Sequence, residues 1–229
     1  MSEQLVLDLP HRPALEADDF LVSACNAAAV RLIDAWPDWP GGVQVLCGPA
    51  GCGKSHLANV WRLKSGATRL APESLGRRSP GVLPAVEAFA IEDLDRVAID
   101  EHAMFHLLNS LREEGVSALL TARTPPASWQ VHLPDLVSRL RSIPVVTIGA
   151  PDDDLLQAVL LKQFTDRQLN PEPHVIAFLV TRMERSMEAV RHLVAALDRA
   201  ALAAGRKITR PMAAEVLQQL AAASGSDAV

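Results

Sequence analysis

Up to about residue 150, two patterns of hydrophobic positions alternate along the chain. Short apolar runs bounded by Gly, Pro or charged residues predict buried strands, which we expect at 43–47, 67–71, 86–93, 116–121 and 145–148. Between these runs, apolar residues recur every three or four positions, which predicts helices directly after residue 55 and at 26–33, 101–114 and 135–141. Strands that alternate with helices indicate an α/β domain built on a parallel sheet.

From residue 152 onward the hydrophobic pattern is helical throughout. We expect four helices, near 155–160, 175–180, 187–201 and 209–220. Asn170-Pro171 predicts the cap and first-turn proline of the second of these helices. The sequence therefore predicts a parallel-sheet core followed by a small all-α domain. The expected boundaries are a leader at 1–17, the α/β domain at 18–150, the helical domain at 151–221 and a frayed tail at 222–229.

Composition narrows the classes of protein to consider. Of 229 residues, 49% are hydrophobic and 21% charged, which is typical of a globular protein. The net charge of −5 argues against a broad DNA-binding surface, and we expect no direct sequence-specific DNA binding. The first residues show no basic region followed by an apolar run, and no later apolar run is long enough to span a bilayer, so we expect neither a targeting nor a membrane segment. Cys25, Cys47 and Cys52 have no metal-ligand spacing, so we expect reduced thiols in a cytoplasmic protein.

Residues Gly48–Ser55, GPAGCGKS, match the phosphate-loop pattern G-x-x-x-x-G-K-[ST] between a predicted strand and a predicted helix. Glycines let successive N–H groups point at phosphate oxygens, and the helix N-terminus adds a positive dipole end. The Lys54 ammonium reaches the β- and γ-phosphates, and the Ser55 hydroxyl ligates Mg²⁺. A chance Gly-rich turn is the alternative, which this context disfavours. We predict that ATP or ADP with Mg²⁺ is bound by Pro49, Ala50, Gly51, Cys52, Gly53, Lys54, Ser55 and His56.

The predicted strand at 86–93 ends in two carboxylates, Glu92 and Asp93. At the carboxyl end of a buried parallel strand, one carboxylate can hold a metal and the other can polarise the attacking water. An acidic strand end that faces solvent is the alternative. We predict Glu92 as a metal ligand beside Ser55, and Asp93 as a catalytic residue. Thr121, at the tip of the next strand, is predicted to contact the γ-phosphate or the attacking water.

Two N-terminal segments have candidate binding roles. The run Gln4-Leu5-Val6-Leu7-Asp8-Leu9 alternates apolar residues, as an edge strand or a frayed terminus would. It also resembles the Q-L-x-L-x-L peptides by which bacterial proteins bind the replicative sliding clamp, with Gln4, Leu5, Leu7 and Leu9 as the contact residues. Leu21 and Val22 precede the phosphate-loop strand and are predicted to line an adenine pocket. Packing in the hydrophobic core is an equally good explanation for these two residues.

Five further stretches have recognisable patterns: Phe20-Leu21-Val22 with Asn26, Ile91-Glu92-Asp93, Leu120–Pro126, Leu133–Leu140 and Ala196-Leu197-Asp198-Arg199. Together with the phosphate loop and the helical region after the sheet, they resemble the DnaA-related family of AAA+ ATPases. The resemblance covers the chain from about residue 18 to residue 220. It implies a phosphate-loop core with a helical lid.

The initiators of this family have an N-terminal interaction domain and a C-terminal helix-turn-helix domain, and we expect neither here. That expectation and the peptide at 4–9 make the chain similar to the Hda-type regulators. Such regulators bind a nucleotide, dock on the DNA polymerase sliding clamp and stimulate hydrolysis of ATP bound to a DnaA-type initiator. The resemblance therefore implies negative regulation of replication initiation. The sequence leaves the oligomeric state open, a homo-oligomer included.

The resemblance also implies roles for two arginines. Arg139 corresponds to the arginine finger, whose guanidinium enters the partner's ATP site and stabilises transition-state charge. A salt bridge within its own domain is the alternative role of Arg139. Arg191 corresponds to the sensor-two arginine, which touches phosphate. It lies beside the apolar face of the third helix of the lid, and an arginine that is simply solvated is the alternative.

Two departures from the family pattern bear on hydrolysis. Glu92 stands where the family usually has Asp, and Arg123 stands where the initiator has Asp. We therefore predict weak or no intrinsic ATPase activity and stable retention of nucleotide. Other classes stay open: an autonomous AAA+ ATPase such as a helicase-loading or remodelling subunit, a DNA-binding initiator-like module and a small-molecule kinase.

Overall fold

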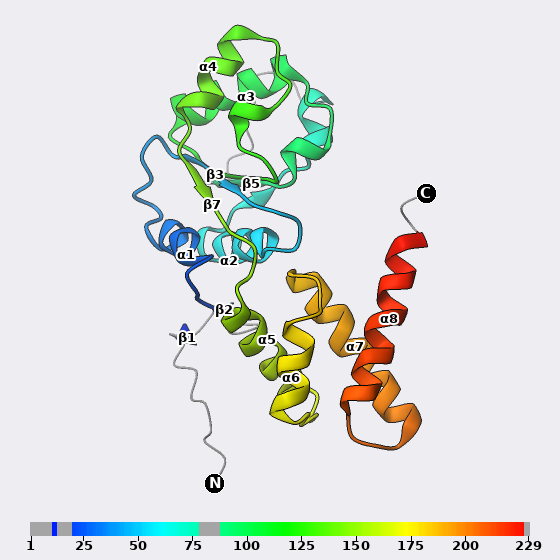
Figure 1. The fold of residues 1–229 in the computed structure, drawn as a ribbon. Coiled ribbons are helices and arrows are strands. Elements are labelled where there is room, and N and C mark those ends of the chain that lie inside the picture. Colours follow the sequence, from blue (N-terminus) through cyan, green and yellow to red (C-terminus); the bar gives the residue numbers. More distant parts are fainter. Residues whose placement is uncertain (1–10, 13–19, 78–87, 227–229) are drawn as a thin grey trace. The chain divides into compact units, whose positions relative to one another are not determined.

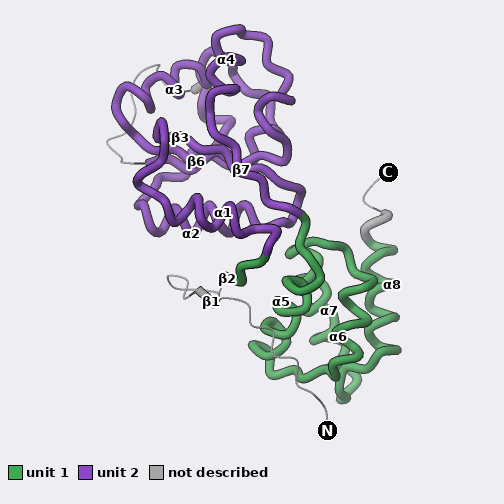
Figure 2. Tube along the Cα trace, turned by 60° about the vertical axis from the view of Figure 1, so that its left-hand side comes forward, with its two compact units in different colours: residues 1–12, 20–23, 150–229 green, residues 13–19, 24–149 purple. Residues whose placement is uncertain are grey.

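The computed structural model describes residues 11–12, 20–77 and 88–226. The chain forms two compact units (Figure 2): residues 24–149 make an α/β unit, and residues 150–226 together with 20–23 make a helical unit. The predicted domain boundary at residue 18 placed residues 20–23 in the α/β domain. In the structure, β2 (Phe20–Leu21) pairs antiparallel with β1 (His11–Arg12) and lies against the first helix of the helical unit.

The α/β unit is built on a five-stranded parallel sheet, which confirms the predicted fold class. Its order is β4-β5-β6-β3-β7, so the strand that leads into the phosphate loop lies between two others. The strands are β3 (Val43–Cys47), β4 (Thr68–Arg69), β5 (Ala88–Ile91), β6 (Ser117–Ala122) and β7 (Val145–Thr147). Because all strands run in one direction, the segments that follow them emerge at one edge, the carboxyl edge of the sheet.

Helices cover both faces of this sheet (Figure 1). On one face lie α1 (Ala27–Asp34) and α2 (Lys54–Ser65), and on the other lie α3 (Glu101–Glu114) and α4 (Pro134–Ser142). Short 3₁₀ helices occupy Pro72–Arg77, Leu94–Arg96 and Pro126–Ser128.

Side chains alternate between the two faces along each strand. Phe89 and Ile91 of β5 pack in the core with Met104 of α3 and Leu136 of α4. The intervening positions of β5, and the residue after Ile91, therefore face α2. This alternation decides which polar residues at the carboxyl edge can lie near the phosphate loop.

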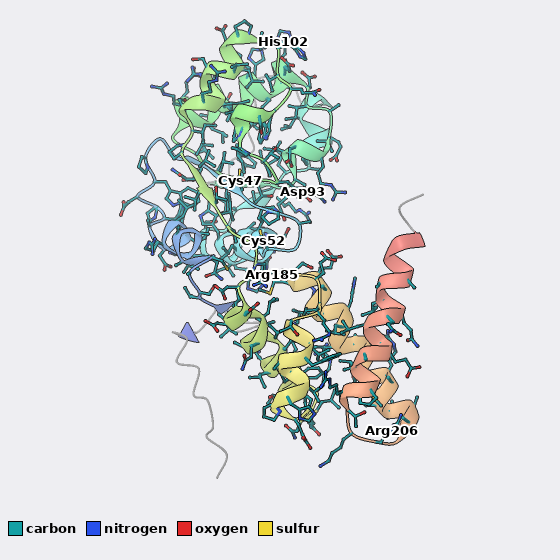
Figure 3. All side chains as sticks on the ribbon, in the orientation of Figure 1. Cys47, Cys52, Asp93, His102, Arg185 and Arg206 are labelled. Carbon is teal, nitrogen blue, oxygen red and sulfur yellow. The ribbon has the colours of Figure 1, made fainter. Side chains whose placement is uncertain are left out.

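The helical unit contains the four predicted helices, α5 (Asp153–Asp166), α6 (Pro173–Val180), α7 (Met187–Ala204) and α8 (Arg210–Ser226). Their apolar faces form one core, with Leu160, Phe164, Leu179 and Val194 among its buried members. Arg185 lies in the α6–α7 connection (Figure 3). It pairs with Asp153 at 2.8 Å and donates to the Pro151 carbonyl.

Two helix ends differ from the sequence-based prediction. α6 begins at Pro173, with Glu172 at its N-cap, so Asn170-Pro171 precedes the helix instead of starting it. Pro173 has the fixed φ of a first-turn residue and holds Glu172 in an extended conformation. α8 continues to Ser226, past the predicted onset of fraying at 222, because Ala221, Ala222 and Ala223 are strong helix formers.

The predicted clamp peptide at 4–9 lies outside the described residues. Within the parts of the chain that the structure describes, no helix combines the length and apolar character needed to cross a membrane.

Candidate nucleotide-binding site

The loop between β3 and α2 has the close packing and backbone conformation that require glycine. A Cβ on Gly48 would lie 2.5 Å from the carbonyl oxygen of Ile148 and 2.8 Å from the Sγ of Cys52. Gly51 and Gly53 have φ values of 69° and 107°, in the left-handed region that side chains disfavour. These features form the curled loop that the motif predicts, directly before the N-terminus of α2.

Lys54, the first residue of α2, lies inside this curl with only 6% of its surface exposed. Its ammonium donates to the carbonyl oxygens of Gly48 at 2.7 Å and Pro49 at 2.9 Å. A buried ammonium held by two neutral carbonyls can exchange them for phosphate oxygens, which are stronger acceptors because they carry charge. Ser55 is exposed and His56 half-buried on the first turn of α2.

Two buried thiols lie at this loop (Figure 3). Burial raises the pKa of Cys52, against the opposing effect of the Lys54 charge. Burial also raises the pKa of Cys47 to about 11, helped by the negative charge of Asp95 and opposed by Lys54. Both thiols therefore stay protonated near neutral pH, and no thiolate competes with an anionic ligand for Lys54.

The tips of β5 and β6 bring two of the predicted catalytic residues together. The backbone N–H of Asp93 donates to the hydroxyl of Thr121 at 3.1 Å, and Thr121 is fully buried. Asp93 adopts a left-handed conformation with φ 57°, and its carboxylate lies 3.9 Å from Arg96. Thr121 thus fixes the backbone turn that carries Asp93.

Glu92, predicted to be a metal ligand, instead forms an ion pair with Arg69. Its carboxylate lies 3.2 Å from the Nε of Arg69 on β4, and its side chain is 15% exposed. A carboxylate engaged by a guanidinium is not a free metal ligand. With Glu92 paired in this way, the predicted pair of Ser55 and Glu92 does not fit Mg²⁺, which prefers one or two carboxylate ligands.

Asp95, three residues after Glu92, is a structurally important acid that the sequence analysis missed. One of its carboxylate oxygens accepts hydrogen bonds from the N–H of Arg123 at 2.8 Å, the N–H of Thr124 at 2.9 Å and the Thr124 hydroxyl at 3.1 Å. It therefore holds the segment after β6, which includes Arg123. Its partners lie far along the chain, so no local pattern indicates this role.

Arg139 lies in the last turn of α4, half-buried. Within the described residues, its guanidinium makes no hydrogen bond or ion pair. α4 ends at Ser142 and β7 begins at Val145, so the last turn of α4 lies near the amino edge of the sheet. The phosphate loop follows β3 at the opposite, carboxyl edge.

The other predicted site residues belong to the helical unit. Arg191 is exposed on α7, and Leu21 and Val22 are half-buried. Their contacts with a nucleotide stay predictions.

Known structures share this architecture. Domain III of the replication initiator DnaA from Thermotoga maritima superposes with a TM-score of 0.74 at 17% identity, covering 87% of this chain and 94% of that one. AMPPCP-bound DnaA from Aquifex aeolicus gives 0.64 at 17% identity, covering 77% of this chain and 62% of that one. The RuvB Holliday junction branch migration motor of Thermotoga maritima gives 0.65 at 14% identity, covering 86% and 67%. The fold is therefore that of the AAA+ proteins.

The helical unit also matches a known family. Residues 152–217 match the family described as "Hda, lid domain", and they span α5, α6, α7 and the first half of α8. This match covers 66 of the 229 residues, and together with the DnaA-like fold it makes the chain similar to the Hda-type, DnaA-related proteins.

Proposed function

We propose that this chain is a negative regulator of a DnaA-type initiator. On this proposal it binds an adenine nucleotide at Gly48–Ser55, docks on the DNA polymerase sliding clamp in the cytoplasm, and stimulates hydrolysis of the ATP bound to the initiator. The catalytic contribution acts in trans, through Arg139. The match to the Hda lid family and the DnaA-like fold support a DnaA-related partner.

The position of Arg139 is the observation that carries this proposal. An arginine that served the chain's own nucleotide would need to reach the carboxyl edge of the sheet, whereas Arg139 lies near the amino edge. Its guanidinium has no partner within the described residues, so it is available to a neighbouring protein. Arginine fingers of this kind accelerate phosphoryl transfer by about 10³–10⁵-fold.

The phosphate loop supports nucleotide binding by this chain. The glycine-dependent curl and the buried Lys54 ammonium form an anion site at a helix N-terminus. DnaA from Aquifex aeolicus, which shares the fold, binds the ATP analogue AMPPCP. Because Glu92 is paired with Arg69, we propose weak intrinsic turnover and retention of the nucleotide as ADP.

Docking on the clamp is assigned to Gln4, Leu5, Leu7 and Leu9. In a pull-down with the purified clamp, the full chain should be captured, and replacement of Gln4 and Leu5 by alanine should abolish capture. Capture that persists in this variant would contradict the assignment.

The catalytic assignment is tested with Arg139→Ala, using Arg141→Ala as a matched control. Both arginines lie in the last turn of α4, but residues two apart on a helix face different directions. The initiator is loaded with ATP, and single-turnover hydrolysis is measured with clamp on DNA and each variant. We expect Arg139→Ala to lose about 10³-fold of the stimulation or more, and Arg141→Ala to stimulate like the wild type.

Nucleotide binding and the midpoint of thermal unfolding should be the same in both variants. Stimulation by Arg139→Ala at the wild-type level would contradict the proposed role of this arginine.

A further inference from the structure

The pair formed by Arg69 and Glu92 is built into the sheet. In the parallel pairing of β4 with β5, Arg69 lies opposite Ala90, and the N–H of Leu70 donates to the Ala90 carbonyl at 2.9 Å. Paired residues on neighbouring strands share a face, and Ala90 shares its face with Glu92 two positions later. Strand register therefore places the guanidinium and the carboxylate together.

This pair lies on the face of the sheet that α2 covers. Phe89 and Ile91 point into the core formed with α3 and α4, so Ala90 and Glu92 point to the opposite face. Ser55, the other predicted metal ligand, lies on the first turn of α2. The ion pair and Ser55 therefore belong to the same side of the sheet, and Glu92 follows β5, two strands from the phosphate-loop strand β3.

Of the other carboxylates that follow β5, Asp95 is firmly held and Asp93 has only an exposed partner. Asp93 lies 3.9 Å from Arg96, and Asp95 accepts three hydrogen bonds from the segment after β6. Mg²⁺ at a phosphate site is usually held by one or two carboxylates together with the phosphates and several waters. Of these three acids, Glu92 is the one on the sheet face that α2 covers, and Arg69 neutralises its charge.

Arg69 brings a positive charge of its own. Its Nε engages Glu92, which leaves the N–H groups of both Nη atoms for other acceptors. Its side chain is 70% exposed, so these donors are open to an incoming ligand. A guanidinium suits this role because it stays charged and presents its donors in a planar fork.

We propose that the Arg69–Glu92 pair takes the place of a divalent metal at this site, so that the phosphate loop binds ADP without requiring Mg²⁺. This inference rests on the proposed nucleotide binding and specifies the form of the ligand: a nucleoside diphosphate free of metal. Arg69 supplies the positive charge and keeps Glu92 from acting as a metal ligand.

The test is calorimetric titration of the full-length chain with ADP, in excess Mg²⁺ and in excess EDTA at one ionic strength. For the wild type, the dissociation constants in the two conditions should agree within about twofold. Arg69→Ala frees a largely buried carboxylate that gains from a cationic partner. In this variant Mg²⁺ should tighten ADP binding by about tenfold or more.

Two further variants control for charge and position. Arg69→Lys keeps a cation beside Glu92 and should remain independent of Mg²⁺. Arg112→Ala removes an exposed arginine from the last turn of α3, which leads into the amino end of β6, and should behave like the wild type. Glu92→Gln removes the charge that a metal would need without changing Arg69, and its ADP affinity should also be the same in both conditions.

Tenfold tighter ADP binding by the wild type in Mg²⁺ would overturn the inference, and so would a folded Arg69→Ala variant that shows no response to Mg²⁺. Failure of the wild type to bind ADP in either condition would contradict the proposed function itself, and the inference with it.

Discussion

The charged side chains at the carboxyl edge of the parallel sheet are engaged within the chain, whereas, in the described parts of the chain, two arginines near its amino edge are not. At the carboxyl edge, Lys54 is held by two backbone carbonyls, Glu92 by Arg69 and Asp95 by the segment after β6. Near the amino edge, Arg139 and Arg141 in the last turn of α4 have no hydrogen bond or ion pair from their side chains to the residues described.

This difference separates two kinds of functional group. A group that serves the chain's own ligand can be positioned in advance by contacts within the chain, which lowers the cost of ordering it on binding. A group that serves another protein's site must remain available until that protein arrives. The carboxyl edge therefore fits a site that holds a nucleotide, and Arg139 fits a group that acts on a neighbour.

The largest effect at the carboxyl edge should come from Lys54. Lys54→Ala removes the buried ammonium, and we expect ADP affinity to fall by about 100-fold, or roughly 2.7 kcal/mol, in a calorimetric titration. Lys64→Ala is the matched control, because Lys64 on the same helix donates to the carbonyls of Ile33 and Asp34. It should leave ADP affinity unchanged. Equal losses in the two variants would show that the phosphate loop has no special role.

The next effect, on stability instead of binding, should come from Asp95, and it would sharpen the comparison by separating structural acids from catalytic ones. Asp95→Asn weakens three hydrogen bonds to a charged acceptor, so the free energy of unfolding should fall by about 1.5–3 kcal/mol in urea denaturation. Asp93→Asn is the control, because Asn tolerates the left-handed conformation of Asp93 and its ion pair at 3.9 Å is exposed. It should change stability by less than about 0.5 kcal/mol. Equal stability of the two variants would contradict the structural role of Asp95.

The elements with local signals could be predicted from sequence. Short apolar strands, helical periodicity and the phosphate-loop pattern depend on neighbouring residues, so the parallel sheet, the helical lid and the loop before Lys54 were all expected. The start of α6 was misplaced because two prolines, Pro171 and Pro173, both suit a first turn, and only packing decides between them.

The partners of the charged side chains could not be predicted in this way. The pairing of Arg69 with Glu92 depends on the register of β4 against β5, and the bonds from Asp95 to Arg123 and Thr124 depend on the order of β5 and β6 in the sheet. These contacts join residues far apart in sequence. Such contacts affect the interpretation most at the carboxyl edge, where the predicted metal ligand Glu92 is part of an ion pair with Arg69.

The most direct test of the central claim asks which protein's ATP is hydrolysed. In one reaction, the initiator carries ATP labelled on its γ-phosphate and this chain carries unlabelled ADP. In the other, this chain carries the labelled ATP and the initiator carries AMPPCP. Clamp on DNA is present in both, and release of labelled phosphate is followed over a single turnover. We predict fast release only when the label is on the initiator. Release at an equal rate from the chain's own ATP would contradict the account.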